Sequence, residues 1–125
     1  MFFGEAIVNF KECGCGHKWE TREDFMSDPT VEVVGYQVNF GNLQAGLFLF
    51  NHGIGKCRTT LAIPAGDFLD LHKGPIFKER LLGTPECGGE CLHRDTLRPC
   101  PARCECSFVR DVLTEVVHWP KRPAA

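Results

Sequence analysis

Five of the eight cysteines in this chain fall within one stretch of twenty residues, 87–106. The spacing is Cys87-x3-Cys91, then eight residues, then Cys100-x3-Cys104-x-Cys106. Glycines and prolines in the same stretch argue against a regular helix or strand. An irregular loop of this length is uncommon in a compact domain unless something restrains it. The stretch therefore predicts a crosslinked loop, held by metal bonds or by disulfides.

A second pair of cysteines, Cys13 and Cys15, lies near the start of the chain, with a glycine after each one. Glycine permits positive φ and lets backbone amides approach a thiolate, so this pattern is typical of a tight turn that presents two sulfurs to one ion. Structural zinc takes four tetrahedral ligands, usually thiolate or imidazole. We therefore expect zinc to be bound by the clustered cysteines: Cys13, Cys15, Cys87, Cys91, Cys100, Cys104 and Cys106.

The spacing does not decide whether these cysteines bind one ion or two. An economical site joins Cys13 and Cys15 to two cysteines of the later stretch, and a second site uses the remainder. Joining segments so far apart in the chain would close a large loop, which stabilises most in the chain-entropy picture. His17 and His93 are spare ligands. The runs C-x2-C-x2-C and C-x4-C-x2-C of ferredoxins are absent, which argues against an iron–sulfur cluster.

The cellular compartment of a protein decides whether its cysteines are more often metal ligands or disulfides. The sequence shows no secretory signal, because residues 1–10 lack a basic start and carry Glu5 and Asn9, and no apolar run is as long as a membrane span. We therefore expect a cytoplasmic protein, in which cysteines are more often metal ligands or redox thiols than a disulfide framework. The net charge of −2 argues against nucleic-acid binding.

Cys57 stands apart from the other seven cysteines, between Lys56 and Arg58. Two cationic neighbours favour a thiolate, so an exposed Cys57 is a candidate reactive thiol. A Cys57 that begins a core strand is instead an inert, small apolar residue. A third interpretation makes it a partner in a metal site.

The rest of the sequence predicts an α+β fold of one domain, residues 1–120, with a mobile tail at 121–125. Apolar alternation indicates about four strands, at residues 5–12, 31–40, 45–50 and 58–63. The last three form an antiparallel meander, and the run 47–50 is either a core strand buried on both faces or a dimer edge.

Helical patterns occupy most of the remaining chain. Short helices are expected after Thr21, at 67–72 and at 76–82. An amphipathic helix, capped by Ser107 and ended by Pro120, is expected at 108–117, packed on the antiparallel sheet.

The segment from Cys13 to Trp19 resembles the knuckle of zinc-ribbon and treble-clef proteins. One residue rather than two separates its cysteines, which departs from the usual knuckle. Together with residues 100–106, this segment also resembles a small set of uncharacterised bacterial cysteine-rich proteins. That resemblance implies no known activity.

These features favour a zinc-binding domain with a structural metal, acting as a binding or regulatory module for a protein partner or a second copy of itself. No residue is assigned a catalytic role. One alternative is a thiol redox sensor or oxidoreductase that uses Cys57 or the pair Cys104/Cys106. Another is a metal-dependent hydrolase, for which Glu90 and residues 93–95 could supply polar groups.

Overall fold

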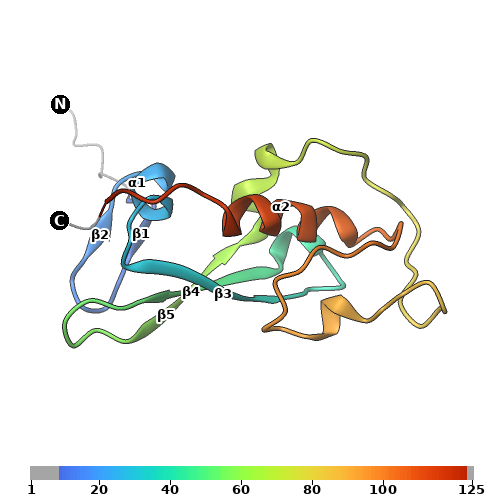
Figure 1. Ribbon diagram of the computed structural model, residues 1–125, viewed down its shortest axis with the longest axis horizontal. Coiled ribbons are helices and arrows are strands. Elements are labelled where there is room, and N and C mark those ends of the chain that lie inside the picture. Colours follow the sequence, from blue (N-terminus) through green and yellow to red (C-terminus); the bar gives the residue numbers. More distant parts are fainter. Residues whose placement is uncertain (1–8, 124–125) are drawn as a thin grey trace, which may run out of the picture.

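The computed structural model of the chain describes residues 9–123, and two antiparallel sheets and a C-terminal helix make up its fold. This confirms the α+β prediction. Figure 1 shows its elements, which are β1 (Lys11–Glu12), β2 (Lys18–Trp19), α1 (Arg22–Met26), β3 (Val31–Gln37), β4 (Leu47–His52), β5 (Thr59–Pro64) and α2 (Ser107–Val117). Short 3-10 turns at Leu43–Ala45, Ala65–Leu71 and Glu90–Leu92 complete it. Among residues 9–123, none of the helices has the length and apolar character of a membrane span.

The larger sheet has three antiparallel strands in the order β3-β4-β5, with β4 at its centre. The first predicted strand is only partly seen: β1 pairs with β2 in a separate sheet of two strands, and residues 5–8 lie outside the described part. β4 alternates, with Phe48 and Phe50 buried and Leu47 and Leu49 half-buried. It is therefore a central strand with one well-covered face, rather than a strand buried equally on both.

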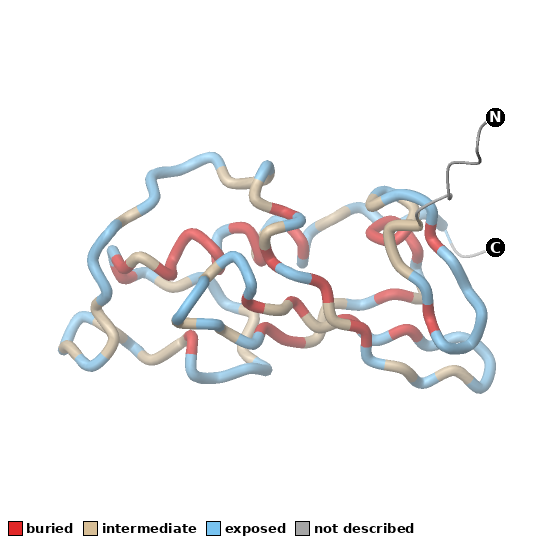
Figure 2. Tube along the Cα trace, turned by 180° about the vertical axis from the view of Figure 1, so that it is seen from behind, coloured by how far each residue is buried: buried red, intermediate tan, exposed pale blue. Residues whose placement is uncertain are grey.

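The helix α2 supplies much of the core. Val109, Val112 and Leu113 are fully buried, and each buried aliphatic side chain of this kind contributes about 1.5–3 kcal/mol. They share one core with an aromatic group built from Phe25, Phe48, Phe50 and Phe68. Figure 2 shows buried residues concentrated along α2 and the middle of the sheet.

Both ends of the first helix are held by specific hydrogen bonds. The Thr21 hydroxyl accepts from the backbone amide of Asp24 at 3.0 Å and caps the short helix predicted after Thr21. At its other end Lys121 donates to the carbonyl of Met26 at 2.6 Å, and the amide of Arg122 donates to Ser27 at 2.7 Å. The segment predicted as a tail is thus bonded to α1 at residues 121 and 122, and residues 124–125 lie outside the described part.

The helix predicted at residues 76–82 does not form, and the chain crosses the surface there without regular structure. Ile76 is 56% exposed, so the apolar pattern does not face a core. The backbone amide of Leu81 donates to the sulfur of Cys104 at 3.1 Å instead of to a helical carbonyl. A tertiary contact has replaced the local hydrogen bond that a helix would require.

The cysteine-rich stretch, residues 87–106, crosses one edge of the sheet. At β3 the amide of Tyr36 donates to the carbonyl of Arg94 at 2.7 Å. The register of β3 shifts between Val33 and Gly35. A Cβ at Gly35 would lie 2.8 Å from the Arg94 oxygen, so only glycine permits this approach.

Candidate metal centre

The first half of the centre is the turn of the β1–β2 hairpin. The amide of Cys13 donates to the carbonyl of His17 at 2.8 Å, and the amide of Gly16 donates to Cys13 at 2.9 Å. Gly16 has φ +100°, in the region that favours glycine. This tight turn places the sulfurs of Cys13 and Cys15 on the same side of the hairpin, as the sequence predicted.

The second half comes from the connection between β4 and β5. His52 is the last residue of β4, and Cys57 lies two residues before β5 begins. Between them the amide of Cys57 donates to the carbonyl of Ile54 at 2.9 Å, and Gly55 has φ +58°. The connection folds back so that an imidazole and a thiol, both at the strand ends, point toward the first turn.

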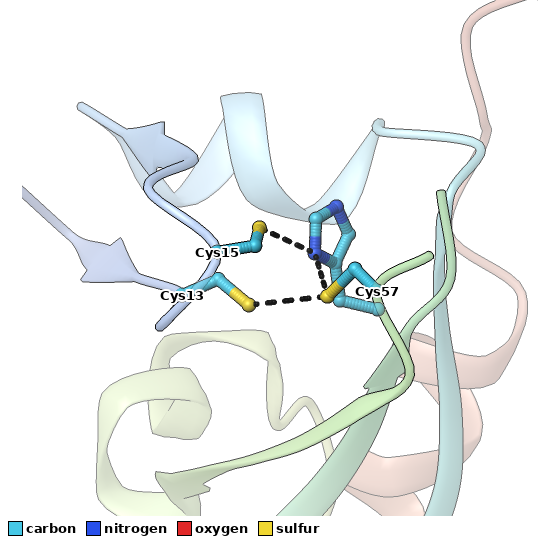
Figure 3. Close-up of side chains that lie close together, drawn as sticks. Cys13, Cys15 and Cys57 are labelled. Carbon is cyan, nitrogen blue, oxygen red and sulfur yellow. Dashed lines mark hydrogen bonds between the residues drawn. The ribbon is translucent and has the colours of Figure 1, made fainter. Parts of the chain in front are cut away.

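Figure 3 shows the three thiols and an imidazole converging from these two hairpins. The sulfur of Cys13 lies 3.6 Å from that of Cys57. The Nδ1 atom of His52 lies 3.4 Å from the sulfur of Cys57 and 3.8 Å from that of Cys15. All four ligand atoms are within 4.8 Å of one another.

These distances fit a tetrahedral zinc ion. With Zn–S bonds of about 2.3 Å and Zn–N bonds of about 2.0–2.1 Å, the sulfurs lie about 3.8 Å apart and sulfur and nitrogen about 3.6 Å apart. Three of the six separations, at 3.4–3.8 Å, lie close to these values, and the others are within 4.8 Å. The donor set, three thiols and one imidazole, is also a common one for structural zinc.

Backbone amides influence the pKa values of the two thiols in the first turn. The amide of Cys15 donates to the sulfur of Cys13 and is the main reason that the pKa of Cys13 falls from 9.0 to about 6, although burial opposes it. For Cys15 the amide of His17 also favours the thiolate, but the neighbouring thiol of Cys13 and burial raise its pKa above the ordinary value. Adjacent thiols cannot all ionise without a counter-charge. A divalent cation supplies that charge and so stabilises the thiolates.

Aromatic and polar side chains hold the centre in place. The indole of Trp19 donates to the carboxylate of Asp28 at 2.8 Å and packs edge-on against His52, with ring centroids 4.9 Å apart. Trp19 is 2% exposed and His52 is 1% exposed. His17, a spare ligand in the sequence analysis, lies 3.7 Å from Asp28 and 4.4 Å from the Trp19 ring instead.

Two members of the centre, Cys57 and His52, lie outside the ligand set predicted from the sequence. The sequence allows Cys57 to be a reactive thiol, an inert core residue or a metal-site partner, and the structure places its sulfur beside that of Cys13. His52 was missed. A signal for it existed, because His52 and Cys57 flank a turn that contains two glycines, at the adjoining ends of two strands.

The structure does not bring Cys13 and Cys15 to the cysteines of the later stretch. The later cysteines lie at the opposite end of the molecule in both whole-chain views (Figures 1 and 2). Cys91, Cys104 and Cys106 form a separate buried cluster there, with Cys100 packed against it. The polar groups considered for a hydrolase, Glu90 and residues 93–95, also belong to that end and not to the first centre.

A cleft of about 770 Å³ lies beside the first centre. Apolar side chains from three elements line it, among them Val33 on β3, Val116 on α2 and Trp119. His52, Arg58 and Lys121 add polar or charged atoms. The volume falls in the range of small-molecule sites.

Comparison with known proteins gives no relative. No family model matches the sequence, and no curated protein and no solved structure is significantly similar to it. The resemblance of residues 13–19 to a zinc knuckle, and of the chain to bacterial cysteine-rich proteins, stays a prediction.

Proposed function

We propose that this chain is a small zinc-binding domain in which Cys13, Cys15, His52 and Cys57 hold one structural ion. The observation that carries the proposal is the convergence of four suitable donor atoms within 4.8 Å of one another. Zinc is favoured over Mg²⁺ or Ca²⁺, because thiolate and imidazole are poor ligands for those hard cations.

The number of donors favours a structural over a catalytic ion. A catalytic zinc keeps three protein ligands and leaves a position for water or substrate, whereas a structural zinc is closed by four. Here four protein donors are available. The hydrolase alternative would need one of them to be displaced.

An ion at this position would crosslink the two hairpins. The β1–β2 sheet has two residues in each strand, and a hairpin of that size is not stable alone. Apart from the centre, Lys11 reaches the second hairpin by donating to the carbonyl of Ala62 at 3.0 Å. Joining Cys15 to His52, 37 residues apart, would remove much of the freedom of the unfolded chain.

We assign the domain the role of a binding or regulatory module in a reducing, cytoplasmic setting. The cleft beside the centre supports the role of a binding module, because it is large enough for a ligand or a protein side chain and its rim carries both apolar and charged groups. The reducing, cytoplasmic setting is proposed from the thiol chemistry, because zinc binds these cysteines only in the reduced state.

Elemental analysis of protein purified without added metal tests this function. The expected result is zinc bound to the chain, with Cys13, Cys15 and Cys57 alkylated only after chelation. Replacing Cys13 or His52 should abolish this zinc, whereas Cys100→Ser should not. A metal-free protein with fewer than eight titratable thiols would contradict the proposal, and would favour the redox sensor or oxidoreductase instead.

A further inference from the structure

The second cysteine cluster is buried although it lies in an irregular stretch. Cys91 is 6% exposed, Cys104 is 1% exposed and Cys106 is 4% exposed. Leu81 and Leu82 pack against them, together with Cys100. Val38, Phe40 and Leu43 also pack against this cluster, but these side chains come from other segments, so the irregular stretch contributes little besides its cysteines and Ala102 to its own order.

The thiols of this cluster are in contact with one another. The sulfurs of Cys104 and Cys106 lie 3.4 Å apart. The thiol of Cys106 also interacts with that of Cys91, and Cys91 is an electrostatic neighbour of Cys87. Cys91, Cys104 and Cys106 therefore meet at one place, and Cys87 lies on the turn that carries Cys91.

Backbone amides donate hydrogen bonds to two of these sulfurs, as they do to sulfurs of the first centre. The amide of Gly89 donates to the sulfur of Cys87 at 3.3 Å, and the amide of Cys106 donates to that of Cys104. In both cases the donor lies two residues after the cysteine, as Cys15 does after Cys13. Gly89 has φ +76°, so each of the two turns contains a glycine in the left-handed region, Gly16 in the first and Gly89 in the second. Hydrogen bonds of this kind orient metal-bound thiolates.

A buried cation next to the cluster supplies an independent observation. Arg110 on α2 is 0% exposed, and within the described part of the chain it forms no ion pair. Its guanidinium donates to backbone carbonyls of the cysteine-rich stretch, including those of Glu90 and Thr96, and it lies close enough to Cys91 to act on that thiol electrostatically.

Buried charges are normally paired or belong to a metal site. Four thiolates around a divalent ion carry a net charge of about −2, which would compensate the charge on Arg110.

We propose that Cys87, Cys91, Cys104 and Cys106 form a second metal site, a tetrathiolate zinc centre distinct from the first. This inference goes beyond the proposed function and does not depend on it. In residues 9–123 only the first centre has all its ligand atoms within 4.8 Å of one another. Metal binding at the second site therefore requires the Cys87–Cys91 turn to close onto the Cys104–Cys106 pair.

Metal stoichiometry tests the second site on the full chain. The expected result is two zinc ions per wild-type chain, one in Cys104→Ser, and one in Cys13→Ser, measured by native mass spectrometry and elemental analysis. Cys100→Ser is the matched control, because Cys100 packs at the margin of the same cluster, and it should keep two ions. One ion in the wild type, lost in Cys13→Ser, would overturn the second site and leave the first intact. Loss of an ion from Cys100→Ser would overturn the ligand set.

Two measurements on the wild-type chain keep the test decisive if a variant fails to fold. Cobalt substitution should give thiolate-to-cobalt charge-transfer absorbance about twofold larger than a single Cys3His centre gives, because seven thiolates rather than three bind metal. Alkylation mapped by peptide mass spectrometry should leave all four proposed ligands unlabelled until chelator is added. Labelling of Cys87 or Cys91 before chelation, or a Cys104–Cys106 disulfide two hydrogens lighter, would overturn the proposal.

Discussion

The two cysteine clusters of this molecule have similar sulfur chemistry on different scaffolds. The first is built on the turns of two hairpins, whose strands bring Cys13, Cys15, His52 and Cys57 together through backbone hydrogen bonds. The second lies on an irregular stretch, held by Arg110 and by contacts with Leu81. An ion at the first site would therefore pin the small β1–β2 hairpin to a sheet that forms without the ion, whereas an ion at the second site would help to fold its own loop.

Removing the metal should produce the largest difference between the two clusters. An ion that binds only the folded chain adds about 4 kcal/mol to the free energy of unfolding when its concentration is 1,000 times the dissociation constant. We expect chelation to lower the thermal midpoint strongly. Limited proteolysis should then cut the chain first within residues 83–103, before the β3–β4–β5 sheet. Equal protection of that stretch with and without chelator would contradict the difference between the scaffolds.

Replacing the buried cation should affect the second cluster alone. Arg110→Met leaves several carbonyls of the cysteine-rich stretch without donors and should cost about 3 kcal/mol in the free energy of unfolding. Zinc at the first centre should remain, as measured by elemental analysis of the folded variant. Arg110→Lys, which keeps the charge but not the planar group of donors, is the matched control and should be intermediate. An unchanged free energy of unfolding in Arg110→Met would show that Arg110 does not stabilise the cysteine-rich stretch.

The first centre has its own buried polar anchor in Asp28. Burial opposes ionisation of Asp28, but hydrogen bonds from Thr30 and Trp19 outweigh it and hold the pKa of the carboxyl below its ordinary 3.8. Since the folded pKa is lower than the unfolded one, Asp28 stabilises the fold above about pH 4, and this contribution is lost as pH falls through the folded pKa.

Asp28→Asn should therefore cost about 1–2 kcal/mol at pH 7, and the difference from the wild type should shrink below about pH 4. Denaturant unfolding across this pH range measures it. Asp70→Asn is the control, because Asp70 is 62% exposed in its ion pair with Arg22, and its effect should stay under about 0.5 kcal/mol. A difference that grows toward acid pH would reverse the assigned sign.

The smallest expected effects come from the glycine turns. Each cluster has one glycine with positive φ and a nearby glycine without it, which serves as the control. Gly16→Ala and Gly89→Ala force a side chain into positive φ, at about 1 kcal/mol each. Neither Gly14 nor Gly88 has positive φ, so alanine at those positions should be nearly neutral. Competition with a zinc chelator should show weaker binding at the first cluster for Gly16→Ala and at the second for Gly89→Ala. Equal effects from all four variants would show that the turns do not shape the sites.

Local patterns in the sequence predicted the elements that depend on local interactions. The amphipathic helix at residues 108–117 and the Cys13–Cys15 turn are examples, because their periodicity and glycines act within a few residues. The partners of that turn could not be predicted in the same way. His52 reaches it through the packing of one hairpin on another, and the spacing of His52 and Cys57 indicates only their shared turn, not its contact with Cys13 and Cys15. The helix predicted at 76–82 failed for a related reason, since a distant sulfur, that of Cys104, takes the amide of Leu81.

The carbonyl of Arg94, which accepts the amide of Tyr36 beside Gly35, has a consequence for solution behaviour. An unpaired strand edge is a template for pairing with another molecule, and proteins usually cover or interrupt such edges. Here the cover on β3 is supplied by the cysteine-rich stretch. An ion that holds this stretch in place would therefore also protect the protein from edge-to-edge aggregation. Protein stripped of that ion should associate in a concentration-dependent manner before its sheet unfolds.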